Sequence, residues 1–264
     1  MRRVFFFGLL VLILQINNLH SQPIWNSTSD KIYDKDWLIN PVAEKANVYK
    51  TDDGKNIVLY NGLVKRTFRI QPNVVCIDYK NMGNGQQLLR AIKPEAKVII
   101  DNKEYNVGGL HGQTENAYLL PEWLDSFTVN ENDFQFVKYE VNDIKPYVRW
   151  EQTAWATNRN QPTGKVLSFL FQSNLSELKN VIIKVNYELY DGIPLVIKQV
   201  SVENKSDHAI TLNRVVNETL ALVEEESAVV GTPEQMKKQH GIYVETNYAF
   251  NNAMRYDISD QTTH

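Results

Sequence analysis

The sequence is poor in the residues that form several common kinds of site. Its 264 residues include 1 cysteine and 5 histidines, so neither an intramolecular disulfide nor a cysteine-rich zinc site can form. The histidines are widely separated, and no two have the spacing of a metal-binding pair. We therefore expect no metal site and no cofactor.

Glycine and proline are also scarce, at 12 and 9 residues, which excludes collagen-like and low-complexity chains. Neither positive nor negative charge dominates, because the chain has 28 basic and 31 acidic residues and a net charge of -3. Without a basic stripe, nucleic-acid binding has little electrostatic basis. The chain is 43% hydrophobic and 11% aromatic, which is enough apolar material for a folded core.

A long apolar run occurs at the N-terminus. Met1 to Arg3 is basic, Val4 to Ile16 is apolar, and Asn17 to Ser21 is polar. This order is typical of a secretory signal peptide, and the run is short for a membrane span, which needs ~20 residues. We predict cleavage near Ser21, a secreted or periplasmic location, and no membrane span in the mature chain. The alternative is an uncleaved N-terminal anchor.

From Lys55 onward the sequence predicts short strands separated by turns. Asn61-Gly62 lies between two β-rich runs within Lys55 to Ile70, which predicts a hairpin with a type I′ turn. Asp101-Asn102 has the same position within Lys97 to Val107. Further strands are predicted over Val74–Tyr79, Phe134–Val141, Val166–Phe171, Leu195–Glu203 and Ile210–Val216.

The clearest strand is Val181 to Tyr190, where apolar and polar residues alternate as in a strand with one buried face. Helical candidates are limited to a turn at Pro121–Leu124 and a short segment at Thr232–Lys238. Strand–helix alternation is absent, so the predicted fold class is all-β, an antiparallel β-sandwich with few short helices. We interpret residues 1–21 as the signal peptide, 22–53 as an N-terminal segment packing on the sandwich, and 54–264 as the sandwich domain.

No catalytic motif can be identified. The glycine-rich stretch from Gly108 to Gly112 lacks the Lys-Ser/Thr of a phosphate-binding loop, and a Gly-x-Ser-x-Gly elbow is absent. With 31 acidic residues, the carboxylate pair of a glycosidase cannot be located by pattern. We interpret the acidic run Glu224 to Glu226 as a solvated sheet edge, and Cys76 as a small buried apolar residue. No catalytic residue is assigned.

Aromatic side chains are the best binding candidates, because their flat faces stack on sugar rings. Trp123, Trp150 and Trp155 are therefore candidates for carbohydrate or interface contacts. Trp155 opens a polar loop that runs to Gly164, and His111 lies among glycines in a loop that suits close contact. The alternatives are core or interface tryptophans and a turn histidine without a role.

Several segments together resemble a known family. They are Asn56–Phe68, Leu88–Ala96, Tyr105–Gln113, Tyr187–Pro194 and Val202–Asn204. This set resembles the N-terminal β-supersandwich domain of the α-galactosidase-like glycoside hydrolases, the melibiase clan, whose sandwiches look like the galactose-mutarotase fold. The resemblance covers roughly residues 50 to 250, and Tyr-Glu-Leu-Tyr-Asp-Gly-x-Pro is its most specific part.

In that family the sandwich precedes a (β/α)₈ barrel, which carries the catalytic aspartates, and none of the barrel's motifs matches this chain. The resemblance therefore implies a non-catalytic module of a secreted hydrolase, truncated before a catalytic barrel. The implied partners are an α-galactoside-type glycan and the missing barrel or a partner subunit. Two alternatives stay open: a stand-alone carbohydrate-binding module, and a mutarotase-type sugar epimerase, against which the scattered histidines count.

Trp155→Ala tests the rim position that the loop sequence predicts. We expect sugar binding or assembly to change while the melting temperature of the protein moves little, because no core cavity opens. A core tryptophan would instead lose ~3–5 kcal/mol of stability on truncation. A thermal melt measures this, and a large drop in melting temperature would show that Trp155 belongs to the core.

Overall fold

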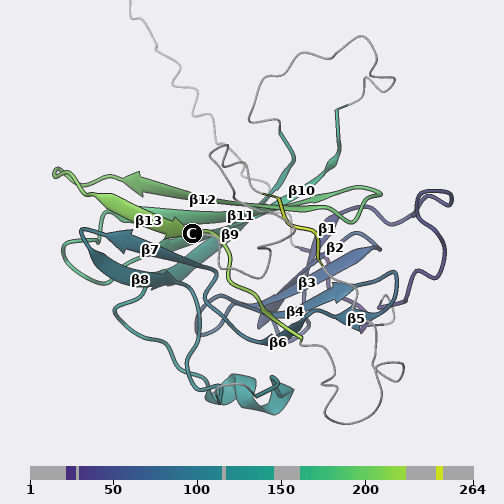
Figure 1. Cartoon of the computed structure of the whole chain (residues 1–264), viewed down its shortest axis with the longest axis horizontal. Helices are drawn as coiled ribbons and strands as arrows, with labels where there is room; N and C mark the ends of the chain where they lie inside the picture. The colour runs from purple at the N-terminus through teal and green to yellow at the C-terminus, as the bar shows by residue number, and fades with distance from the viewer. Residues whose placement is uncertain (1–21, 28–29, 115–116, 146–160, 224–241, 246–264) are drawn as a thin grey trace, which may run out of the picture.

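The computed structural model describes residues 22–27, 30–114, 117–145, 161–223 and 242–245, and its elements are labelled in Figure 1. The strands are β1 (Asn47–Lys50), β2 (Asn56–Tyr60), β3 (Val64–Arg69), β4 (Val75–Asn81), β5 (Gln86–Gln87), β6 (Leu89–Ala91), β7 (Ala96–Ile100), β8 (Lys103–Val107), β9 (Gln135–Asp143), β10 (Gly164–Gln172), β11 (Val181–Tyr190), β12 (Val196–Asn204), β13 (Leu212–Val216) and β14 (Ala221–Leu222). One 3₁₀ helix, η2 (Pro121–Ser126), lies among them.

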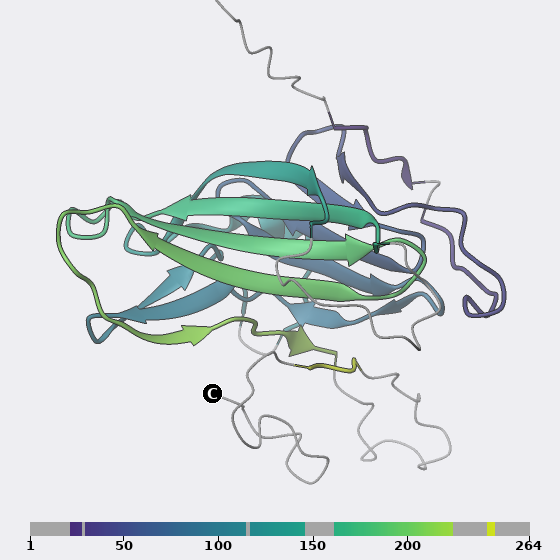
Figure 2. The same cartoon turned by 90° about the horizontal axis from the view of Figure 1, so that it is seen from above.

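The strands form antiparallel sheets in two layers, which confirms the all-β sandwich (Figure 1, Figure 2). One layer is the four-stranded sheet β12-β11-β10-β9. The five-stranded sheet β1-β2-β3-β4-β5 and the three-stranded sheet β13-β7-β8 face it, and a small ladder joins β14 to β6. Every pairing between named strands is antiparallel.

The core fills the space between the layers with aromatic and branched side chains. The predicted buried face of β11 is confirmed, because Ile183, Val185 and Leu189 are fully buried, but Glu188 on the face predicted to be solvated is buried as well. Across the layers, the ring of Phe68 on β3 lies 5.1 Å from that of Phe169 on β10. Edge-to-face ring pairs of this kind stabilise a core beyond the area they bury.

Both predicted hairpins form, but their turns differ. Asp101 and Asn102 have φ of 48° and 65°, so the type I′ turn between β7 and β8 is confirmed. Between β2 and β3 only Gly62 has a positive φ, of 86°, and the predicted type I′ turn at Asn61-Gly62 is wrong. The reason is that the Asn61 side chain accepts the N–H groups of Leu63 and Val64, at 3.0 and 2.9 Å, and fixes another loop shape.

The N-terminal segment lies against the five-stranded sheet and supplies its first strand, β1. The Trp25 ring contacts those of Tyr49 and Tyr60 edge-on, at 5.2 and 5.0 Å. Asp30 forms an ion pair with the buried ammonium of Lys65, at 2.5 Å. The boundaries of the N-terminal segment stay a prediction.

The turn predicted at Pro121–Leu124 is η2, which begins at a proline as expected for a first-turn position. The segment predicted at Thr232–Lys238 lies outside the described residues, as do the signal peptide and the acidic run from Glu224. None of the helices formed by the described residues is both long enough and apolar enough to span a membrane.

A single buried side chain, Asn61, joins the two layers of the sandwich. Its Nδ2 donates to the backbone oxygens of Tyr190 and Ile193, at 2.7 and 2.8 Å. With the two N–H groups that its Oδ1 accepts, the amide satisfies four backbone groups at once. The β2–β3 loop is thereby fixed to the turn after β11.

We predict that Asn61→Ala lowers the free energy of unfolding by about 2–4 kcal/mol, because it leaves buried backbone groups without partners. Urea unfolding measures the loss. Asn84→Ala is the matched control, since that exposed amide bonds only within its own turn, to Gln86, and we expect a change within about 0.5 kcal/mol. Equal unfolding midpoints for Asn61→Ala and the wild type would contradict the assignment.

Candidate functional site

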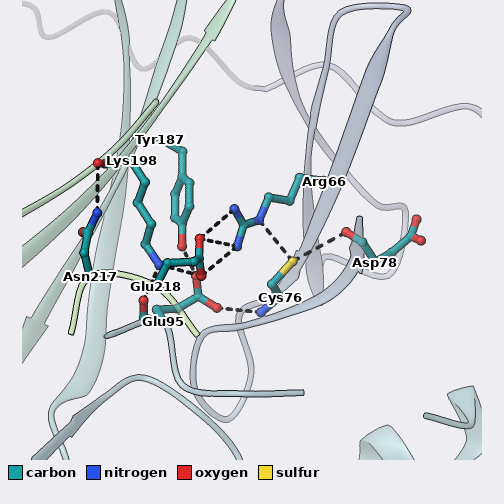
Figure 3. A network of polar contacts seen from close by, with 8 residues as sticks. All are labelled: Arg66, Cys76, Asp78, Glu95, Tyr187, Lys198, Asn217 and Glu218. Carbon is teal, nitrogen blue, oxygen red and sulfur yellow. Dashed lines mark hydrogen bonds and ion pairs between the residues drawn. The ribbon is translucent and has the colours of Figure 1, made fainter. Parts of the chain in front are cut away.

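A network of buried polar side chains lies between the layers (Figure 3). Its centre is Arg66 on β3, whose side chain is 3% exposed. Both terminal nitrogens of the guanidinium donate to the carboxylate of Glu218, at 3.1–3.3 Å. Nε donates to the sulfur of Cys76 on β4, at 3.2 Å. Each of the three guanidinium nitrogens therefore has an acceptor, as burial of a cation demands.

Aromatic rings surround the same guanidinium. Its carbon lies 4.6 Å from the ring centre of Tyr187, 4.8 Å from that of Tyr79 and 5.4 Å from that of Phe68. Guanidinium groups stack favourably on ring faces, and the attraction is larger where water is excluded. The rings hold Arg66 in one position.

Glu218 follows β13 and binds two cations at once. Besides Arg66, its carboxylate binds the ammonium of Lys198 on β12, at 2.9 Å. Burial alone would raise the pKa of Glu218, but the charges of Arg66 and Lys198 outweigh it and hold this pKa below the ordinary value. Glu218 in turn helps raise the pKa of Arg66 well above its ordinary value, against the effect of burial. The carboxylate is thus ionised over the whole neutral range.

A second carboxylate, Glu95, completes the network from the segment before β7. It accepts the hydroxyl of Tyr187 on β11 and the backbone N–H of Cys76, at 2.7 Å. Its backbone oxygen accepts a hydrogen bond from Lys198. Burial, and then the charge of Glu95, raise the pKa of Tyr187 well above its ordinary value, so the phenol stays protonated.

The predicted burial of Cys76 is confirmed, and burial raises the pKa of its thiol to about 12. No local sequence pattern indicates that its sulfur accepts a hydrogen bond from Arg66. A thiol with so high a pKa is a poor nucleophile at neutral pH. Cys76 therefore serves as a packing residue and an acceptor.

The space beside the network is small. A cavity of about 10 Å³ adjoins it, which is room for about one water molecule. Its walls include Arg66, Cys76, Glu95 and the chain from Glu218 to Ala221. A second, polar cavity of about 130 Å³ lies nearby, lined by Arg90, Ala91, Ile92, Lys93, Gln113, Thr114 and Ala221. The network itself has no room for a sugar ring.

The turn after β11 lies in a second set of polar contacts. The carboxylate of Asp191 accepts the N–H of Ala46, at 2.8 Å, and the hydroxyl of Thr163, at 2.7 Å. Asp191 thereby connects the chain before β1, the chain before β10 and the end of β11. Tyr187 and Asp191, which both belong to the Tyr-Glu-Leu-Tyr-Asp-Gly-x-Pro segment, thus make contacts that hold the fold together.

The predicted site residues fall into two groups. Trp150 and Trp155 lie outside the described residues. His111 lies on the loop after β8 with its side chain 53% exposed, and its Nε2 is 3.6 Å from a carboxylate oxygen of Asp133. Trp123 on η2 is half-buried against the small cluster of Val75, Ile92, Leu124 and Phe127, which Leu110 also contacts. His111 and Trp123 thus lie in adjoining loops, and their role in sugar contact stays a prediction.

Sequence reasoning missed Arg66, Lys198 and Glu218 altogether. The burial of Lys198 could have been predicted from the sequence. Lys198 lies two residues from Val196 and two from Val200, so it shares their face of the strand, and both valines pack against the core. A lysine on the inward face of a strand needs a buried partner. No local pattern marks Glu218 as that partner.

Comparisons with known proteins find similarity among solved structures. No family model matches the chain, and no curated protein matches it. Among solved structures, the GH36 alpha-galactosidase AgaB from Geobacillus stearothermophilus matches with a TM-score of 0.36 and 12% identity. The match covers 62% of this chain and 23% of that protein, so it spans less than a quarter of the length of that protein.

We predict that Glu218→Gln lowers the free energy of unfolding at neutral pH by about 3 kcal/mol, because Arg66 and Lys198 lose their shared counter-charge. The folded-state pKa of Glu218 lies below its ordinary value of 4.5. The contribution is therefore complete above that value and is lost as pH falls through the lowered pKa.

Urea unfolding across a pH series measures this as a stability gap between wild type and Glu218→Gln. The gap should be constant near neutrality and should close as pH falls below 4.5. Glu203→Gln is the control, since that carboxylate is mostly exposed and pairs only with an exposed lysine. A gap that persists unchanged into acid would contradict the ion-pair assignment.

Proposed function

We propose that the chain is a non-catalytic β-sandwich module of a secreted α-galactosidase-like glycoside hydrolase. The observation that carries the proposal is that residues of the segments that resemble the family make the contacts that hold this fold together. Tyr187 binds Glu95 between the layers, and Asn61 and Asp191 fix the turn after β11. These residues give the module a fixed shape.

The chemistry of the network supports a structural role. Retaining glycosidases need two carboxyl groups ~5–5.5 Å apart on either side of a sugar. Here Glu218 is bound by two cations and Glu95 accepts the Tyr187 hydroxyl and a backbone N–H. The adjoining cavity holds about one water molecule. In the proposed enzyme, catalysis takes place on a separate barrel.

Carbohydrate contact, in this proposal, belongs to the loops. His111 and Trp123 present a half-exposed imidazole and a half-buried indole in adjoining loops, and Trp150 and Trp155 add two aromatic candidates from the sequence. Aromatic faces with polar neighbours are suited to α-galactoside-type glycans. The same loops are available to a catalytic barrel or a partner subunit.

Two other functions stay as outcomes of the test. A stand-alone carbohydrate-binding module would bind sugars without any associated barrel. A mutarotase-type epimerase would need an acid and a base facing a sugar, and Glu95, which accepts the Tyr187 hydroxyl, is a buried carboxylate that lines a cavity.

We predict that the purified protein does not hydrolyse p-nitrophenyl α-galactoside and does not accelerate the change in optical rotation of fresh α-D-galactose. An established α-galactosidase and an established mutarotase are the positive controls. Hydrolysis above the no-protein rate, surviving repurification, would contradict the non-catalytic role. Faster mutarotation that is lost in Glu95→Gln would favour the epimerase.

Sequencing the transcript downstream of His264 tests the enzyme context. An in-frame (β/α)₈ barrel supports the proposal. A stop codon at that point together with binding of α-galactosides, measured by calorimetry, would favour the stand-alone binding module instead.

A further inference from the structure

The outer strand β9 has one open edge. It pairs with β10 along one side, and among the described residues no strand pairs with its other side. The start of β9 is held, because Asn73 accepts the N–H of Phe136, at 2.9 Å. Val137, the extra residue of a bulge in the β10 pairing, is 51% exposed. From Lys138 to Asp143 the pairing with β10 is regular.

Open edges attract other strands, and proteins usually protect them with proline, bulges or inward-pointing charges. β9 contains no proline, and its bulge lies near one end. Its Tyr139 and Val141 contact the core, whereas Lys138 and Glu140 are 57% and 37% exposed. A regular segment of edge therefore remains for a partner strand, provided that the partner matches the charges of Lys138 and Glu140.

The sequence around Tyr139 is complementary to itself. It reads Val137-Lys138-Tyr139-Glu140-Val141. When two copies are aligned antiparallel on Tyr139, each Lys138 faces Glu140 of the other copy and each Val137 faces Val141. Opposite charges directly across a ladder stabilise it, and like charges destabilise it.

Other registers lack this match. Sliding one copy by two residues places Lys138 opposite Lys138 in one direction, and Glu140 opposite Glu140 in the other. Sliding it by one residue turns the core face of one copy toward the solvent face of its neighbour. The charge pattern thus selects one register, in which both cores lie on the same side.

We propose that β9 pairs with β9 of a second copy around a twofold axis through Tyr139. The pairing joins two four-stranded sheets into one continuous sheet, with Lys138, Tyr139 and Glu140 of each copy at its centre. The interface is isologous, so one patch serves both subunits. Backbone hydrogen bonds supply the attraction, as in other strand additions, and the Lys138–Glu140 contacts set the register.

Charge-reversal variants of Lys138 and Glu140, made in separate copies of the chain, test the proposed pairing. Wild type should show a reversible monomer–dimer equilibrium in sedimentation velocity over a concentration series. Lys138→Glu places carboxylates opposite each other at both ends of the pairing, and Glu140→Lys does so with ammonium groups. Each variant alone should dimerise at least about tenfold more weakly. Mixing the two in equal amounts should restore the dimer as a heterodimer.

The restoration separates an interface from an internal role. Within one chain, Lys138 and Glu140 also form an ion pair at 2.7 Å, and each single variant breaks it, but mixing cannot repair it. Lys138→Glu/Glu140→Lys in one chain should dimerise like wild type. Lys97→Glu is the control, since it breaks a comparable exposed pair with Glu104, at 2.9 Å, and should leave the dimer unchanged.

Circular dichroism and thermal melts confirm that each variant is folded. A wild type that stays monomeric at every concentration would overturn the proposal. So would a single-reversal variant that dimerises like wild type, or a mixture of the two that stays monomeric. None of these outcomes bears on hydrolysis or sugar binding, so this proposal and the proposed function can fail separately.

Discussion

A guanidinium group enclosed between two β-layers constrains the rest of this molecule. Removing a cation from water costs several kcal/mol unless its partners are placed well. Arg66 obtains them from Glu218 and the Cys76 sulfur, and its faces are covered by Tyr79 and Tyr187. These partners come from β4, β11 and the segment after β13, so elements from both layers must meet at Arg66 on β3.

Two different polar devices hold the layers together. Around Arg66 the device is electrostatic, because a carboxylate bound by two cations resists any change that exposes one of them. At Asn61 it is a neutral amide that satisfies four backbone groups. The polar atoms around Arg66 and at Asn61 are already hydrogen-bonded within the fold, whereas a catalytic site needs polar groups that can reach a substrate. The proposed contacts with sugar or partner are placed in the loops around His111 and η2, where the His111 side chain is 53% exposed and Trp123 is half-buried.

Local sequence patterns predicted the longer strands and missed the polar network and the short strands β1, β5, β6 and β14. The buried face of β11 and the turn at Asp101-Asn102 depend on neighbouring residues, and both were predicted correctly. The turn at Asn61 was predicted wrongly, because the Asn61 amide bonds the N–H groups of Leu63 and Val64 and is itself held by carbonyls 129 and 132 residues further on. Arg66 and Glu218 are 152 residues apart, so no pattern within a strand or turn reveals their pairing. Of the predicted contact residues, Trp123 shows why aromatic content alone is ambiguous, since one ring can both pack and face solvent.

The order of the partners along the chain has a consequence for how the protein is made. Arg66 leaves the ribosome long before Glu218, which follows it by 152 residues. During that interval the first hairpins exist without the carboxylate that neutralises Arg66 and Lys198. A dry interface cannot close over an uncompensated guanidinium without a large cost, so Arg66 must stay hydrated and the layers must remain separable. A short segment near the far end of the described sandwich therefore completes a core whose first residues were synthesised much earlier.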